Sequence, residues 1–217
     1  MERVLEPELM IDEAQARAYA EADFAEPHQA AVERFRAKFP EFTRGRVLDL
    51  GCGPGDVTVR FARAFPDITV LGIDGSAAML ECARERLVRE ALVDRVAVEQ
   101  RRLPDPGLVS RGPFDAVIST AVLHHLPDPS VLWETVFAMA APGAPVFVQD
   151  LMRPPTDTDA LRLTALHTVG GPTQLRDDYL ASLRAAFTVA ELRAQVGDRL
   201  TVEAVSDRHL VVSGRAG

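Results

Sequence analysis

Short apolar runs alternate with longer amphipathic stretches through the middle of the chain. The apolar runs predict strands near residues 46–50, 68–73, 95–100, 114–119 and 145–151. The stretches between them have helical spacing and predict helices near 56–65, 76–90 and 130–140. Strands that alternate with helices in this way indicate an α/β protein with a parallel sheet and helices on both faces.

The two ends of the chain extend this pattern. Residues 8–39 predict two helices, and Ile11 belongs to the apolar stripe of the first. Pro27 is expected to separate the two helices and Pro40 to end the second. The remaining elements are predicted after the fifth strand, as helices near 158–168, 177–187 and 188–196 and strands near 200–205 and 208–213.

Composition bounds the class of protein. A chain of 217 residues with 47% hydrophobic residues suits one globular domain. The net charge of −8 argues against a nucleic-acid partner. The two cysteines, Cys52 and Cys82, form no C-x-x-C pair, so we expect neither a disulfide nor a metal site. We find no leader-like N-terminus and no apolar run of membrane-spanning length, and therefore expect a cytoplasmic protein without a membrane partner.

The most informative stretch follows the first predicted strand. Residues 47–50 lead into Gly51-Cys52-Gly53-Pro54-Gly55, and a helix is predicted from Asp56. Glycines permit backbone conformations with positive φ and let a ligand approach the chain closely. The first amides of a helix lack partners within the helix, so a polar or negative ligand group is expected at this turn.

Two further motifs follow in order. Asp74 closes the second predicted strand, about 20 residues after the glycine turn, where a carboxylate suits the two hydroxyls of a ribose. The alternative for Asp74 is a turn or helix-cap residue. Residues 114–129 read F-D-A-V-I-S-x-x-x-L-H-H-L-x-D-P, so that several polar side chains follow the fourth strand at the ligand-binding edge of the sheet.

Together these three motifs resemble the class I S-adenosylmethionine (SAM) methyltransferases, whose first motif is often D-x-G-x-G-x-G, here starting at Asp49. The G-x-G-x-x-G spacing of dinucleotide-binding proteins is absent, although an NAD-type oxidoreductase remains a competitor. The resemblance is good over residues 46–151. It implies a Rossmann-like, seven-stranded, mostly parallel sheet whose last strand is antiparallel, preceded by an N-terminal helical lid.

The resemblance also divides the single domain into four parts. Residues 1–44 would form the lid and residues 45–151 the SAM-binding core. Residues 152–187 would form a helical insertion on the substrate side, and residues 188–217 a closing helix and strand pair.

A set of cofactor-binding residues follows from the resemblance. Asp74 would hold the ribose, the carbonyl of Ser119 would accept from the SAM amine, and the adenine would lie between Met79 and Leu103. The expected cofactor residues are Tyr19, Asp49, Gly51, Cys52, Gly53, Gly55, Asp74, Gly75, Met79, Arg102, Leu103, Ser119 and Thr120. Met79 and Tyr19 also suit ordinary packing positions.

Arg102 departs from the family pattern, which has an acidic residue at this place. An arginine side chain has only donors and cannot accept from the adenine amino group. Either a backbone carbonyl or a nearby acid replaces it, or Arg102 stacks on the purine.

Candidate catalytic and substrate residues lie at the ends of the fourth and fifth strands. His125, and with it His124, could take a proton from an acceptor, or could instead hold the loop to the next helix. Asp150 and Arg153 are candidates for orienting a polar substrate, with a salt bridge as the alternative. His167, Arg176 and Tyr179 are candidates in the insertion.

We therefore predict a SAM-dependent methyltransferase. It would transfer a methyl group to an oxygen, nitrogen or carbon atom of a small polar acceptor by in-line displacement. A SAM-binding regulatory or assembly module without transferase activity is the alternative. The acceptor is left open, and so is the choice between a monomer and a homodimer. Gly51→Val is expected to abolish SAM binding while the protein stays folded.

Overall fold

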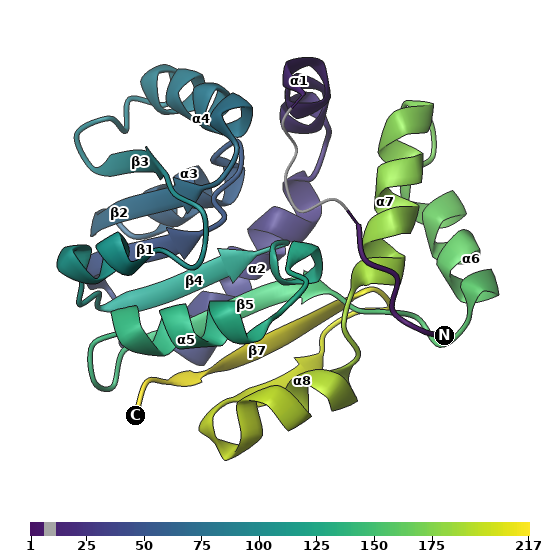
Figure 1. Ribbon diagram of the computed structural model, residues 1–217. Coiled ribbons are helices and arrows are strands. Elements are labelled where there is room, and N and C mark those ends of the chain that lie inside the picture. Colours follow the sequence, from purple (N-terminus) through teal and green to yellow (C-terminus); the bar gives the residue numbers. More distant parts are fainter. Residues whose placement is uncertain (7–11) are drawn as a thin grey trace.

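A central sheet forms the middle layer of the protein (Figure 1). The structure is a computed structural model that describes residues 1–6 and 12–217, so that Ile11 and the expected start of the first helix lie outside the described residues. Among the described residues, seven strands form one sheet in the order β3-β2-β1-β4-β5-β7-β6. The strands are β1 Arg44–Leu50, β2 Asp67–Asp74, β3 Val96–Gln100, β4 Ala116–Thr120, β5 Pro145–Leu151, β6 Thr201–Ala204 and β7 His209–Arg215.

Strand direction confirms the expected fold class. Strands β1 to β5 pair in parallel, whereas β7 runs antiparallel between β5 and β6. This insertion of β7 distinguishes the sheet from the dinucleotide-binding order 3-2-1-4-5-6. The order in which strands are added reverses between β1 and β4, and open α/β sheets bind ligands at such a point.

Helices cover both faces of the sheet. The helices are α1 Glu13–Glu21, α2 Ala25–Lys38, α3 Asp56–Ala64, α4 Ala77–Arg89, α5 Ser130–Met139, α6 Asp157–His167, α7 Thr173–Ala185 and α8 Val189–Val196. Short 3-10 turns occupy Pro106–Arg111 (η1), Leu123–His125 (η2) and Gly197–Arg199 (η3). In Figure 1, α5 and α8 lie on one face and α2 and α3 on the other.

The two faces follow from the period-two pattern of the strands. Along β5, Val146 and Val148 join the core beneath α5 and α8, whereas Phe147 joins the core beneath α2 and α3. Phe35 of α2 is fully buried there, with its ring centroid 5.9 Å from that of Phe147 and 5.0 Å from that of Phe61. Helix α2 is therefore part of the core rather than a detachable cover.

Two boundaries differ from the sequence prediction because of proline chemistry. Pro27 does not separate the first two helices. It lies in the first turn of α2, where a missing N–H costs no helical hydrogen bond, and the break falls at residues 22–24. Helix α7 starts at Thr173 rather than near 177, because Pro172 occupies its N-cap position. Pro40 follows the last residues of α2 as predicted.

Two caps were predicted correctly. The side chain of Ser76 accepts a hydrogen bond from the Met79 amide and caps α4. Thr188 and Glu191 form the expected capping box at the start of α8. Within residues 1–6 and 12–217, no helix is both long enough and apolar enough to cross a membrane.

Candidate functional site

The glycine turn between β1 and α3 is shaped by three left-handed residues. Gly51, Gly53 and Gly55 have φ angles of +71°, +51° and +78°. The amides of Gly51 and Cys52 both donate to the carbonyl of Ile73, at 2.8 and 2.9 Å. The turn is thus fastened to the last residues of β2, and the first two predicted motifs meet at one edge of the sheet.

The three glycines serve different purposes. A Cβ on Gly51 would lie 2.0 Å from a methyl carbon of Val122, so that only glycine fits against the loop after β4. A Cβ on Gly55 would lie 3.3 Å from the Cβ of Ala83, which allows α3 and α4 to pack closely. A Cβ on Gly53 would meet no atom of the described residues within 4 Å, and Gly53 presents its backbone to open space beside them.

Two carboxylates stand behind this turn. Asp49 is buried and accepts a 2.6 Å hydrogen bond from Thr58 Oγ1, while burial raises the pKa of Asp49 to about 7. Asp74 accepts from the Gly53 amide at 2.9 Å and from the Ser76 amide at 2.8 Å, one bond on each oxygen. Burial raises the pKa of Asp74 above its ordinary value, against the effect of these two bonds.

A cavity opens beside these groups at the carboxyl edge of the sheet. Most predicted cofactor residues line it, as does one predicted catalytic residue. They are Tyr19, Asp49, Gly51, Cys52, Gly53, Asp74, Gly75, Met79, Arg102, Leu103, Thr120 and His125. The structure therefore brings together residues that are more than 100 positions apart in the sequence.

Sequence reasoning missed several lining residues. These are His28, Pro54, Asp56, Val57, Ile73, Ser76, Arg101, Ala121, Val122 and Leu126. Ala121 has a φ of +57°, an uncommon conformation for a residue with a side chain, and no residue type in that loop signals it. Among these residues, Asp56 is the one that the sequence could have indicated. It directly follows the glycine turn and starts a helix at the ligand-binding edge of the sheet.

Two predicted cofactor residues do not line the cavity. Gly55 packs against α4 as described above. Ser119 is fully buried within the sheet, and its hydroxyl donates to the carbonyl of Leu50 at 2.8 Å. Thr120 and Ala121, the next residues along the chain, reach the cavity in its place. Strand β4 ends at Thr120, one residue later than predicted. Ser119, the residue expected to contact the cofactor, therefore lies inside the strand.

Asp150 lies beneath the cavity rather than in it. It is buried, and its Oδ2 accepts from the amides of Val122 and Leu123 at 2.9 and 2.7 Å. Its Oδ1 lies 2.5 Å from Nδ1 of His124. Asp150 thus holds the loop after β4 in place, and this arrangement gives no support to direct substrate contact by its carboxylate.

The other predicted substrate-binding residues form contacts elsewhere in the protein or lie outside the cavity. Arg153 donates to the carbonyl of Ala186 and forms an ion pair with Glu191, as the salt-bridge alternative supposed. Tyr179 packs against a small apolar cluster, and burial raises its pKa to about 12. Arg176 is exposed, and His167 lies 3.2 Å from Asp207. Their proposed roles in substrate binding stay predictions.

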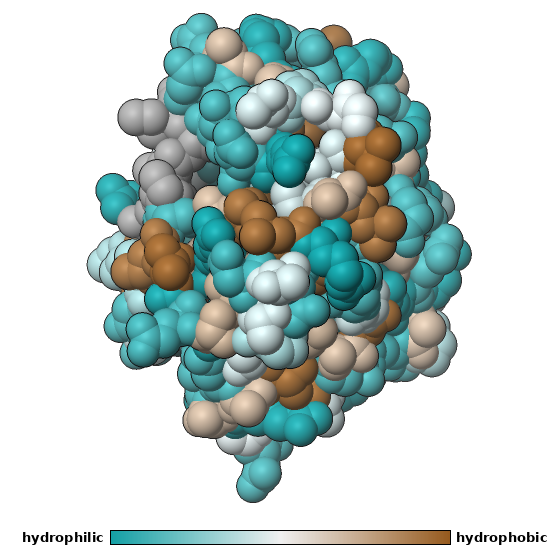
Figure 2. Space-filling view, turned by 90° about the vertical axis from the view of Figure 1, so that its right-hand side faces the viewer, coloured by the Kyte–Doolittle hydropathy of each residue, from teal (hydrophilic) through white to brown (hydrophobic). Residues whose placement is uncertain are grey.

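The surface over α6 and α7 is mixed in character. Leu161, Leu166 and Val169 are exposed apolar residues there. Figure 2 looks onto this side of the molecule and shows its apolar residues in separate patches among polar ones. The view gives no sign of one continuous apolar surface on this face.

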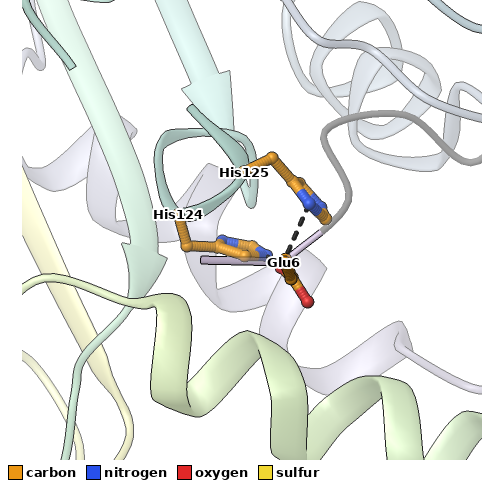
Figure 3. Close-up of side chains that lie close together, drawn as sticks. All are labelled: Glu6, His124 and His125. Atoms are coloured by element: carbon orange, nitrogen blue, oxygen red, sulfur yellow. Dashed lines mark ion pairs between the residues drawn. The ribbon is translucent and has the colours of Figure 1, made fainter. Parts of the chain in front are cut away.

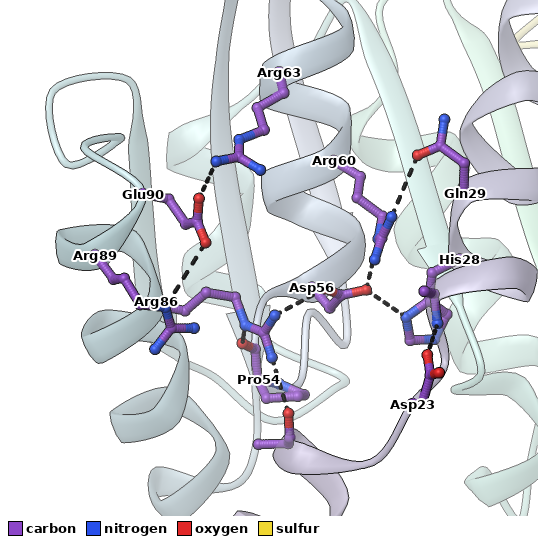
Figure 4. A network of polar contacts seen from close by, with 12 residues as sticks. Asp23, His28, Gln29, Pro54, Asp56, Arg60, Arg63, Arg86, Arg89 and Glu90 are labelled. Carbon is purple, nitrogen blue, oxygen red and sulfur yellow. Dashed lines mark hydrogen bonds and ion pairs between the residues drawn. The ribbon is translucent and has the colours of Figure 1, made fainter.

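A charged network ties the N-terminal helices to the glycine turn (Figure 4). Asp56 lies 2.7 Å from Nδ1 of His28 on α2, and it also accepts from Arg60 and from Arg86, each at 2.8 Å. Arg86 donates further to the carbonyls of Pro54 and Ala20. Burial alone would raise the pKa of Asp56, but the bonds from His28 and Arg60 outweigh it and lower that pKa.

The histidine pair after β4 has two different environments. His124 is buried, and the charge of Asp150 raises its pKa against the opposing effect of burial. His125 is about one third exposed and lines the cavity. His125 therefore remains a candidate for contact with a reacting molecule, whereas the side chain of His124 lies behind the cavity wall.

Comparison with known proteins agrees with this geometry. Residues 48–146 match the model of a methyltransferase domain. A trans-aconitate 2-methyltransferase of Methylobacterium radiotolerans is 42% identical over 104 residues, which are 47% of this chain and 36% of the relative. One from Deinococcus radiodurans is 32% identical over 126 residues, 58% of this chain and 45% of the relative. The chain spans less than half the length of these two relatives.

Solved structures share the fold over nearly the whole chain. A SAM-dependent methyltransferase from Aquifex aeolicus superposes with a TM-score of 0.68 at 17% identity, covering 96% of this chain and 100% of the other. An O-methyltransferase family protein from Burkholderia thailandensis gives 0.70 at 17% identity, covering 95% and 61%.

The sheet order and the glycine turn define a class I methyltransferase fold. The matched domain and the similar relatives agree with the resemblance to class I SAM-dependent methyltransferases that the sequence motifs indicated.

Proposed function

We propose that this chain binds SAM in the cavity and transfers the methyl group to a small polar acceptor, releasing S-adenosylhomocysteine. The observation that carries the proposal is the edge where Asp74, Gly51 and Gly53 meet. There a partly buried carboxylate closes β2, while the backbone of Gly53 faces open space beside it.

Asp74 has the capacity that a ribose requires. Each of its oxygens accepts one backbone amide in the structure, and a carboxylate oxygen can accept more than one hydrogen bond. Two ribose hydroxyls could therefore bind without displacing the bonds that orient the carboxylate. Met79 and Leu103 line the same cavity and offer apolar surface for an adenine ring.

Little side-chain chemistry is needed for the transfer itself. The sulfonium of SAM supplies an activated methyl group, which moves to the acceptor while the electron pair of the broken bond stays on sulfur. An acceptor that carries a proton loses it to water or to a neighbouring base. The protein contributes by holding the two molecules in line, which is the larger part of the rate enhancement in such reactions.

The acceptor is proposed only as a small polar molecule. Two curated relatives are trans-aconitate 2-methyltransferases, but the chain matches less than half of their length. Polar side chains near the cavity include Arg101, which is paired with Glu99 and Asp105, and His28, which is paired with Asp56. We propose that the segment 152–187 shapes the acceptor side and decides which molecule enters.

Calorimetric titration with SAM, S-adenosylhomocysteine and NADH tests the proposal. We expect micromolar binding of the two sulfur nucleosides and no heat from NADH. Purified protein is then incubated with SAM and an acceptor set that includes trans-aconitate, and the release of S-adenosylhomocysteine is measured. Binding of neither sulfur nucleoside would refute the proposal. Tight SAM binding without turnover on any acceptor would favour the binding-module alternative.

A further inference from the structure

Three side chains converge behind the cavity wall from two distant parts of the chain (Figure 3). Glu6 comes from the N-terminal segment, and His124 and His125 come from η2. Glu6 Oε1 lies 3.4 Å from Nε2 of His124 and 3.0 Å from Nδ1 of His125. One donor atom from each residue lies within 4.8 Å of the other two.

These atoms face one another without hydrogen bonding. Both Glu6 Oε1 and His125 Nδ1 are buried and have no hydrogen-bond partner among the described residues, although they are only 3.0 Å apart, a separation that would form an ion pair if the imidazole were protonated. Buried polar atoms without a partner cost free energy and are uncommon in folded proteins. The arrangement is the one expected when several lone pairs point at a common position between them.

Two of the three side chains are oriented by partners on their far sides. Nδ1 of His124 is bound by Asp150, which leaves its Nε2 directed at the cluster. The other carboxylate oxygen of Glu6 accepts from the hydroxyl of Ser182 on α7 at 3.2 Å, which turns Oε1 toward the histidines. A carboxylate behind a histidine is a common feature of metal-binding histidines, since it fixes the tautomer and the ring.

We propose that Glu6, His124 and His125 bind a divalent transition-metal cation of the zinc type. Two imidazoles and one carboxylate are a ligand set that Zn²⁺ uses in sites with an open fourth position. Ligands about 2.0–2.1 Å from a tetrahedral ion lie about 3.4 Å from one another, close to the two separations between Glu6 and the histidines. Mg²⁺ prefers oxygen ligands and does not suit this set.

The charges around the cluster agree with a cation. Glu6 and Asp150 supply two carboxylates, and both imidazoles bind metal in their neutral form. The guanidinium of Arg3 interacts electrostatically with both carboxylates, but its hydrogen bonds go to backbone carbonyls, including those of His124 and Leu126. A divalent ion would therefore balance the buried acids.

The position of His125 connects the proposed metal site to the cavity. His125 belongs both to the cluster and to the cavity wall, so an ion held there has an open coordination position at the acceptor side. An oxygen atom of the acceptor would bind at that position. This last step rests on the proposed methyl transfer, whereas metal binding itself does not. The absence of a C-x-x-C pair led to the prediction that no metal site is present, and the spacing between Glu6 and the histidines, about 120 positions, forms no metal-binding motif.

Direct titration tests the site. Chain without a polyhistidine tag is stripped with a chelator and titrated with Zn²⁺ by calorimetry, alongside Glu6→Gln and His125→Gln. The matched controls are Glu2→Gln, an exposed acid of the same segment, and His167→Gln, a histidine paired with an acid elsewhere. His124 is left unchanged, because its bond to Asp150 also holds the loop.

We expect one equivalent of Zn²⁺ to bind, at least ten-fold more weakly in both cluster variants, and unchanged in both controls. Mg²⁺ should give no comparable heat. Zn²⁺ should raise the melting temperature of the wild-type protein but not that of Glu6→Gln, which separates loss of the site from loss of the fold. Absence of stoichiometric Zn²⁺ binding, or equal binding by the cluster variants, would overturn the proposal.

SAM titrated into the zinc-free and zinc-loaded forms separates the two proposals. SAM binding without any Zn²⁺ binding refutes the metal site alone. Zn²⁺ binding without SAM binding in either form refutes the proposed methyl transfer and leaves the metal site standing.

Discussion

The carboxylate of Asp74 accepts a 2.9 Å hydrogen bond from the amide of Gly53, so that the residue closing β2 holds the turn that follows β1. The two predicted motifs of the cofactor site are therefore one structural unit. A change in either residue is expected to alter the other, because the bond orients both the carboxylate and the backbone of the turn.

Asp74→Ala should weaken SAM binding about 10- to 100-fold. The expected loss corresponds to the roughly 1.5–3 kcal/mol of a hydrogen bond to a charged group. Asp67→Ala is the matched control, because Asp67 is an exposed acid at the opposite end of the same strand. Calorimetric titration measures both variants. Equal affinities for the wild type and Asp74→Ala would remove this residue from the cofactor site.

Gly51→Ala should destabilise the fold by roughly 2–4 kcal/mol, through overpacking against Val122 and a positive φ. The structure thus changes the expectation that Gly51→Val leaves the protein folded, because the clash is with a protein side chain. Adding Val122→Ala should recover part of the loss in urea denaturation. A double variant no more stable than Gly51→Ala would contradict the assigned contact.

Gly53→Ala should behave differently from Gly51→Ala. Its Cβ would meet no atom of the part of the chain that the structure describes within 4 Å, and the positive φ should cost about 1–2 kcal/mol of stability. The methyl group would extend into the cavity and should lower SAM affinity at least ten-fold. Denaturation and titration of the same preparation separate the two effects. Unchanged affinity in a folded variant would place the cofactor away from this backbone.

Asp49 should make stability depend on pH. Burial raises its pKa to about 7 in the folded protein, whereas an unfolded aspartate has a pKa of about 3.9. The folded state therefore holds a proton that the unfolded state releases, and the free energy of unfolding contributed by this group falls as pH rises from about 4 to about 7.

Asp49→Asn should remove this dependence. The variant should gain on the order of 2–4 kcal/mol over the wild type at pH 8, and this gain should shrink as pH falls toward 5. Urea denaturation at a series of pH values measures it, with the exposed Asp198→Asn as control. A stability difference that is independent of pH would show that Asp49 is charged in the folded protein.

Arg86→Gln should loosen the N-terminal helices. Arg86 joins Asp56 to the carbonyls of Pro54 and Ala20, so its loss should cost about 1–3 kcal/mol and expose the segment near residues 20–24 to protease. Arg84→Gln is the control, because Arg84 lies on the same helix in an exposed pair with Glu81. Identical cleavage in both variants would argue against this fastening.

Much of the fold could be predicted because its signals are local. Apolar runs marked the parallel strands, and Ser76 and the Thr188 capping box marked helix starts. The prediction for Pro27 was wrong because a proline that can separate two helices also suits the first turn of the second. The turn at 106–111 was missed, since short 3-10 segments leave no periodic pattern.

The sequence indicated those site residues that lie at strand ends. It did not indicate those whose position depends on a tertiary contact. Asp49 lies near the end of β1, Asp74 is the last residue of β2 and Gly53 follows β1, and all three line the cavity. The position of His28 depends on its bond to Asp56, and that of Glu6 on a chain segment crossing the loop after β4. Such contacts join residues 28 and about 120 positions apart, which no motif spacing encodes.

The place of Asp150 at the end of β5 bears on how this domain can be re-engineered. The insertion 152–187 begins immediately after β5. Asp150 accepts hydrogen bonds from the loop after β4, which lines the cavity. A chimera that receives the insertion of a relative should therefore be joined after residue 151, not before it. If the proposed function holds, a chimera with that junction should change its acceptor preference and still bind SAM.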